Sequence, residues 1–169
     1  MITTLTTARL ILRAPIMADF DDYAAFLASD RASGMGGPMG VEKAWSFLTN
    51  DTAQWPLLGM GALMLVPHGG GPVLGQVAVC HGPLFPEPEL GWLLYAGAEG
   101  QGYALEAAAA MRDWALGPRG LTALVSYIDP RNSRSIRLAE RLGAWHDLSA
   151  VTPNNTPTQC WRHAPGAVA

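Results

Sequence analysis

Apolar and polar positions follow two different periods along the chain. Apolar residues recur every three or four positions in some segments, which predicts helices, and they alternate or run together in shorter ones, which predicts strands. The predicted helices cover residues 18–28, 41–54, 104–116 and 133–142. The predicted strands cover residues 9–13, 57–66, 73–80, 89–95, 121–128, 144–148 and 159–163. Pro56 is expected to end the second helix.

The order of these elements predicts a mixed α/β sheet. Strand hairpins dominate the first half, and one strand–helix–strand crossover follows in the second half. Such an order predicts a sheet with both antiparallel and parallel pairs and with helices on both faces. Neither an internal repeat nor a linker interrupts the pattern, so residues 1–169 are expected to form one domain.

Composition and charge exclude several classes of function. Hydrophobic residues make up 49% of the chain and charged residues 15%, which is typical of a globular protein. The net charge of −3, without a run of Lys or Arg, gives no reason to expect nucleic acid or a membrane as a partner. No apolar run approaches the ~20 residues that span a bilayer. We therefore expect a cytoplasmic protein in which Cys80 and Cys160 stay reduced. The four histidines lack metal-ligand spacing, so no metal is expected.

The segment EGQGYALE (99–106) is the main candidate for chemistry. Glycines at the start of a helix let backbone N–H groups approach an anion, and the helix dipole favours negative charge there. Gly100, Gly102 and the small Ala104 suit such a site, although a tight turn without a ligand is an equal alternative. A Walker loop is excluded because Gly-Lys-Ser/Thr is missing. A dinucleotide fingerprint matches in part, but Leu105 stands at its sixth position and only one crossover unit is present.

Two longer stretches carry a family resemblance. ELGWLLYAGAEGQGYALEAAAAMRDWA (89–115) and LTALVSYIDPRNSRSIRLAERLGA (121–144) resemble the GCN5-related N-acetyltransferase (GNAT) superfamily, in the branch that contains the ribosomal-protein N-terminal acetyltransferases. The matching residues of the first stretch are Glu89, Gly91, Trp92, Gly100, Gly102, Tyr103, Ala104 and Glu106. Those of the second are Asp129, Asn132, Ser135, Leu138, Leu142 and Gly143. The resemblance implies a mostly antiparallel, splayed sheet and acetyl-CoA as co-substrate.

The resemblance also implies where acetyl-CoA binds. Its pyrophosphate would lie on the amides of the segment Gly100, Gln101, Gly102, Tyr103 and Ala104. Its pantetheine arm would pair with the strand edge at Leu93 and Leu94, where a backbone N–H near Leu94 would polarise the thioester carbonyl. Asn132 would contact the pantetheine or cap the following helix.

Two side chains are candidates for the catalytic chemistry. Glu89 begins the cofactor strand, where burial would raise its pKa toward that of a general base, and His81 and Glu87 are rival bases. Ser135 would hydrogen-bond the departing thiolate. Many superfamily members use a tyrosine seven residues after the asparagine, but Ala139 stands at that position here. Glu99 is expected to point to solvent, because a carboxylate facing the pyrophosphate would weaken binding.

These observations predict an N-acetyltransferase that works in a ternary complex without an acyl-enzyme. The acceptor would be a primary amine, on a protein N-terminus or a small molecule, and the sequence does not choose between them. A homodimer remains open. One alternative is a catalytically degenerate acyl-CoA-binding sensor, and another is a dinucleotide-binding oxidoreductase.

Overall fold

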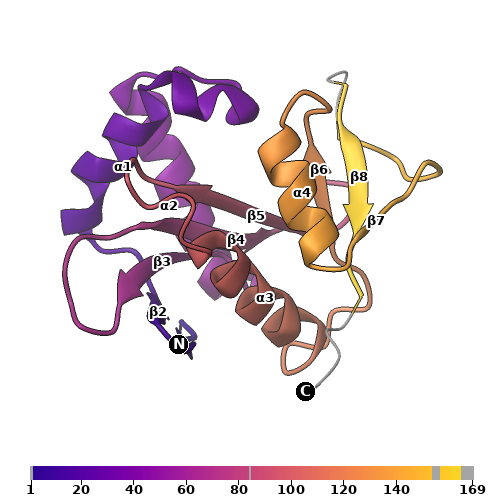
Figure 1. Ribbon diagram of the computed structural model, residues 1–169, viewed down its shortest axis with the longest axis horizontal. Coiled ribbons are helices and arrows are strands. Elements are labelled where there is room, and N and C mark those ends of the chain that lie inside the picture. Colours follow the sequence, from indigo (N-terminus) through magenta and orange to yellow (C-terminus); the bar gives the residue numbers. More distant parts are fainter. Residues whose placement is uncertain (1, 84, 154–156, 165–169) are drawn as a thin grey trace.

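A computed structural model describes residues 2–83, 85–153 and 157–164. Eight strands form one sheet in the order β1-β2-β3-β4-β5-β6-β8-β7 (Figure 1). The strands are β1 (Leu5–Thr6), β2 (Leu10–Arg13), β3 (Ala62–Pro67), β4 (Gly75–Cys80), β5 (Glu89–Leu94), β6 (Val125–Ile128), β7 (Trp145–His146) and β8 (Gln159–Arg162). The helices are α1 (Phe20–Leu27), α2 (Val41–Leu58), α3 (Tyr103–Leu116) and α4 (Ser133–Arg141), with short 3-10 helices η1 (Met17–Asp19) and η2 (Asp30–Met35).

The sheet is mostly antiparallel, as predicted. Every neighbouring pair of strands is antiparallel except β5 and β6, which run parallel. These two strands share a single paired position, Glu89 with Val125. Beyond that position they separate, so that β5 leaves an open edge facing α4 and η2 (Figure 1).

Helices cover both faces of the sheet, which confirms the prediction. Alternate residues of β2, β3 and β4 bury leucines and valines against α3, whose small residues Ala107 and Ala108 allow close approach. The opposite face contacts α1 and α2, where Leu93 of β5 packs among Tyr23, Leu27 and Leu48. Consecutive residues of β5 therefore face different layers. This alternation places Glu89 and Leu93 on the α2 side of the sheet.

The prediction that Pro56 ends the second helix was wrong, because α2 continues through it to Leu58. Pro56 removes one N–H donor from the helix, but contacts made by the neighbouring residues keep this last turn of α2 helical. The indole of Trp55 donates to the carbonyl oxygen of Ala62 at 2.9 Å and is buried. Gly59 ends the helix in the left-handed conformation, with φ of 67°. Strand β3 consequently begins at Ala62, five residues after the predicted start.

Candidate active site

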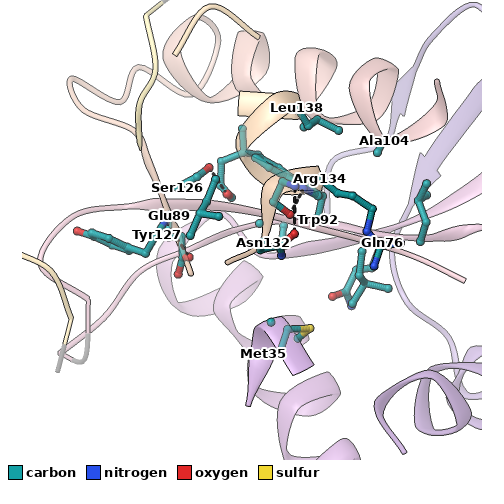
Figure 2. A pocket seen from close by; sticks show the side chains of 18 of the residues that line it. Met35, Gln76, Glu89, Trp92, Ala104, Ser126, Tyr127, Asn132, Arg134 and Leu138 are labelled. Atoms are coloured by element: carbon teal, nitrogen blue, oxygen red, sulfur yellow. Dashed lines mark hydrogen bonds between the residues drawn. The ribbon is translucent and has the colours of Figure 1, made fainter. Parts of the chain in front are cut away.

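A cavity of about 580 Å³ occupies the opening between β5 and β6. Of the predicted site residues, β5 contributes Glu89, Leu93 and Leu94 to its lining, and the glycine loop with α3 contributes Gly100, Gly102 and Ala104. Asn132, labelled in Figure 2, and Ser135 reach it from the start of α4. The fold therefore brings residues separated by more than forty positions in the chain to one cavity.

The glycine loop has the geometry of an anion site. Gly100 and Gly102 have φ of 74° and 82°, a left-handed conformation that favours glycine. A Cβ at Gly100 would meet nothing within 4 Å, so the loop lies open on that side. No side chain caps the N-terminus of α3. The first N–H groups of this helix therefore have no capping side chain, which is compatible with the phosphate site that the sequence predicts.

Two predicted cofactor residues, Gln101 and Tyr103, do not line the cavity with their side chains. The amide of Gln101 turns back and donates to the carbonyl oxygen of Gly97 at 3.0 Å. The ring of Tyr103 lies beneath the guanidinium of Arg9, 4.5 Å from its centroid. Any contact of these residues with an anion would therefore come from their backbone N–H groups.

Glu106 fixes the glycine loop to the N-terminal strands. Its carboxylate accepts hydrogen bonds from the hydroxyl of Thr7 at 2.6 Å, the backbone N–H of Arg9 at 2.8 Å and the Nε of Arg9 at 2.7 Å. Arg9 also donates to the carbonyl oxygen of Gln101 at 2.9 Å. The sequence motif contains Glu106, but its partners lie almost a hundred residues earlier, so sequence spacing alone could not find them.

Glu99 does not simply point to solvent, contrary to expectation. Its carboxylate forms an ion pair with Arg31 of η2 and accepts a hydrogen bond from the N–H of Gly97 at 3.1 Å. Partial burial acts to raise the pKa of Glu99, but the hydrogen bonds and the charge of Arg31 lower it overall. Arg31 also donates to the carbonyl oxygen of Leu94 at 2.9 Å. One arginine thus connects η2, β5 and the glycine loop.

Glu89 lies at the point where β5 and β6 part (Figure 2). Burial raises the pKa of its carboxyl to about 7. The backbone N–H of Tyr127, which donates to Oε1 at 3.4 Å, acts in the opposite direction and lowers this pKa. The negative charge of Asp51 raises this pKa further. A carboxyl that titrates near neutrality can accept a proton from a substrate at physiological pH.

The rival bases occupy different surroundings. Both oxygens of Glu87 accept hydrogen bonds from Arg162, at 2.7 and 2.9 Å, which lowers the pKa of this carboxyl. His81 does not line the cavity, and its backbone N–H donates to the side chain of Gln54 at 2.9 Å. Of the three candidates, Glu89 alone lines the cavity.

Asp51, a further carboxylate on this cavity, was not predicted from the sequence. Its Oδ1 lies 3.7 Å from the Sγ of Cys80, which donates to it. Burial raises the pKa of Asp51 to about 6, although hydrogen bonds from Asn50 and Cys80 act to lower it. Asp51 follows Phe47 by one helical turn, and both line the cavity. That spacing was the only signal in the sequence, and it is equally typical of an exposed helix face.

The start of α4 fixes Ser135 beside Trp92. Asn132 caps the helix, and its side-chain oxygen accepts from the N–H of Ser135 at 3.1 Å. The indole of Trp92, which Figure 2 labels, donates to the hydroxyl of Ser135 at 3.3 Å. Ala139, at the position of the tyrosine found in other members, is fully buried. The capping role foreseen for Asn132 is confirmed.

Metal-binding clusters and membrane-spanning helices are two features that the described residues do not contain. Among these residues, no group of three or more His, Cys, Asp or Glu side chains could hold a metal ion. No helix within the same residues is long and apolar enough to cross a membrane. Cys80 and Cys160 are both free thiols.

Comparison with known proteins identifies the family. Residues 9–144 match the Acetyltransferase (GNAT) domain. An acetyltransferase from Agrobacterium tumefaciens str. C58 is similar over 97% of this chain and 95% of its own, with 46% identity and a TM-score of 0.94. No curated protein matches.

More distant solved structures share the fold. Ribosomal-protein-S5-alanine acetyltransferase from Vibrio fischeri has a TM-score of 0.66 at 16% identity, over 95% of this chain and 94% of its own. Spermidine N-acetyltransferase from Vibrio cholerae, solved with CoA and spermine, has a TM-score of 0.68 at 16% identity, over 90% and 92%. The matched domain covers most of the chain and agrees with the splayed sheet and glycine loop described above, and the chain therefore belongs to the GNAT acetyltransferase family.

Proposed function

We propose that this protein transfers the acetyl group of acetyl-CoA to a primary amine, in a direct reaction within a ternary complex. One observation carries the proposal: a single cavity joins an uncapped helix N-terminus suited to phosphate and a carboxyl whose pKa is about 7. The first group is suited to hold the coenzyme, and the second to take the proton that an amine must lose.

Acetyl-CoA, the co-substrate of this family, supplies the acetyl group as a thioester. The backbone amides of Gly100–Ala104 are the proposed pyrophosphate site, and the edge of β5 at Leu93 and Leu94 is the proposed pantetheine site. This assignment is supported by the open space at Gly100 and by the lack of strand pairing beyond Glu89. Asn132 lines the same cavity, and its side-chain amide is the proposed hydrogen-bond donor to the pantetheine.

The proposed reaction balances with the residues at hand. The amine nitrogen forms a bond to the thioester carbon, and the carbon–sulfur bond breaks. Glu89 takes the proton lost by the amine, and the coenzyme leaves as a thiolate. Ser135 would donate a hydrogen bond to that thiolate; because a thiol has a pKa of only ~8.5, full proton transfer is not required.

A covalent route through cysteine has little support. Burial raises the pKa of the Cys80 thiol strongly and that of Cys160 to about 11. Neither thiol would supply much thiolate at neutral pH, and the thiolate is the nucleophilic form. Direct attack by the amine is therefore the proposed route.

A panel of amines and peptides tests the proposal. Purified protein is incubated with acetyl-CoA and each acceptor, and free thiol and the acetylated product are measured together. We expect turnover with at least one primary amine, and loss of turnover in Glu89→Gln but not in Glu42→Gln, a change at an exposed position of α2.

Two other results would replace the proposal. Binding of acetyl-CoA without turnover of any acceptor would favour a sensor. Stabilisation of the protein by NADH, but not by CoA, would favour a dinucleotide enzyme.

A further inference from the structure

Two carboxyl groups flank Cys80 on the face of the sheet that meets α2. Glu89 is the direct cross-strand partner of Cys80, so their side chains leave the sheet on the same face. Asp51 approaches from α2, with its Oδ1 3.7 Å from the Sγ of Cys80. Both carboxyls line the cavity that contains the proposed coenzyme site.

This pair of acids lacks a counter-charge. Among the described residues, neither Asp51 nor Glu89 forms an ion pair, whereas the nearby Glu99 holds Arg31. The donors that reach Asp51 and Glu89 are neutral: the amide of Asn50, the thiol of Cys80 and the N–H of Tyr127. Partly buried carboxylates are normally paired, so the arrangement favours a cationic ligand.

Two buried polar side chains beside the acids also lack adequate partners. Tyr23 is fully buried and its hydroxyl has no hydrogen-bond partner; burial raises the pKa of this hydroxyl, and the negative charge of Asp51 raises it further. Gln76 lines the cavity at 4% exposure, and its amide reaches only the sulfur of Met64 at 3.8 Å. Buried polar groups are rarely left in this state unless a ligand or ordered water satisfies them.

The lining of the cavity also includes four bulky apolar side chains. Phe26 comes from α1, Phe47 from α2, Met35 from η2 and Phe85 from the segment between β4 and β5. The cavity of about 580 Å³ must also admit the acetyl-bearing end of the coenzyme, so only a small part of the acceptor fits inside it. Two carboxylates and several aromatic side chains on one cavity suit an ammonium group on an apolar body.

We propose that Asp51 and Glu89 bind the ammonium group of a small primary amine with an apolar or aromatic body, and that Asp51 excludes acceptors with a carboxylate beside the amine. Asp51 would hold the ammonium. Glu89 would take one proton from it before attack and pass that proton to water, and Glu89 would then take the second proton, which the nitrogen loses as it bonds to the thioester carbon. This inference rests on the proposed acetyl transfer to an amine.

A matched pair of acceptors tests the inference without any mutation. Phenethylamine and phenylalanine differ only by the carboxylate of phenylalanine. We expect kcat/KM to be at least about tenfold higher for phenethylamine, because the carboxylate of phenylalanine would be repelled by Asp51 and would weaken the hydrogen bond between Asp51 and the ammonium.

The Asp51→Asn variant tests the residue itself. This change keeps the shape but removes the charge, and we expect the KM for phenethylamine to rise about tenfold or more while the Kd for acetyl-CoA stays within about twofold. The ratio of kcat/KM for phenethylamine to kcat/KM for phenylalanine should also be smaller in the same variant. Glu42→Gln, on the exposed face of the same helix, is the control and should leave both constants unchanged.

The results of these experiments distinguish a failure of the acceptor assignment from a failure of the proposed acetyl transfer. If acetyl-CoA binds but no amine is acetylated, the proposed function fails, and the inference fails with it. If amines are acetylated but phenylalanine matches phenethylamine, or if Asp51→Asn leaves the KM unchanged, the acceptor assignment alone is wrong.

Discussion

Arg31 and Glu99 form an ion pair that ties η2 to the glycine loop, and the same guanidinium donates to the carbonyl oxygen of Leu94. The guanidinium of Arg31 lies beside the proposed pyrophosphate site, but the carboxylate of Glu99 neutralises its charge. An arriving pyrophosphate would compete with Glu99 for Arg31. We therefore regard Glu99 as a residue that lowers the affinity for the coenzyme.

The Glu99→Gln variant should bind CoA more tightly. Removal of one negative charge near the phosphates is worth about 1 kcal/mol in a water-like environment, so the Kd should fall about fivefold. Titration calorimetry at low and high ionic strength measures the change, and the gain should shrink with added salt. An unchanged or weaker Kd in Glu99→Gln would contradict this role.

The Glu106→Ala variant should lose both stability and coenzyme affinity. Its carboxylate holds Thr7 and Arg9, and Arg9 in turn holds the loop at Gln101. Loss of these charge-assisted bonds should cost about 1–2 kcal/mol and lower the Tm by about 2–6 °C. Calorimetry should show weaker CoA binding as well. If the Tm falls while the Kd stays the same, Glu106 supports the fold but not the loop.

The Ser135→Ala variant should slow turnover without weakening coenzyme binding. One hydrogen bond to the departing thiolate is worth about 1.5–3 kcal/mol, so kcat should fall about tenfold to a hundredfold. The Kd for CoA should stay nearly constant. Ser133→Ala, at an exposed position of the same helix, is the matched control. Equal effects of the two changes would show that the helix, and not the hydroxyl of Ser135, matters.

The Glu89→Gln variant should be more stable than the wild type at high pH only. The pKa of Glu89 is raised from its ordinary value to about 7 on folding. The folded protein therefore binds more protons than the unfolded chain between these values, and its stability falls as the pH rises through that range. At pH 5 the two proteins should be similar, and at pH 8 the variant should be more stable by about 1–3 kcal/mol. Denaturant melts at both pH values measure the difference, and a constant difference would contradict the raised pKa.

Local patterns were sufficient to predict much of the fold. The order of the elements from the strand at Leu10–Arg13 onward agrees with the structure, because each element carries its own period of apolar residues. The short strand Leu5–Thr6 was not predicted, and the predicted second helix stopped short of Pro56 although α2 continues to Leu58. In both cases tertiary contacts, such as the bond from Trp55 to Ala62, decided the outcome.

The site could be predicted only where its residues belong to continuous motifs. Gly100, Gly102 and Asn132 lie within two short stretches, and the structure brings them to one cavity. Arg31 and Asp51 reach that cavity from η2 and α2, and nothing in their local sequence distinguishes them from surface residues. Their positions follow from how the α1–α2 layer packs on β5, which sequence spacing does not encode.

The most direct test of Glu89 as the base is the pH profile of acetyl transfer in the wild type and in Glu89→Gln. Two accepted amines with different pKa values are compared. If the fall in activity at low pH is caused by protonation of the amine, its midpoint changes with the acceptor; if it is caused by protonation of Glu89, its midpoint is the same for both amines. We predict that wild-type activity falls about tenfold per pH unit below about 7 with both amines. In Glu89→Gln, activity should be lower by about a hundredfold or more, and this limb should vanish. A variant that retains full activity, or keeps the same limb, would contradict the assignment of Glu89 as the base.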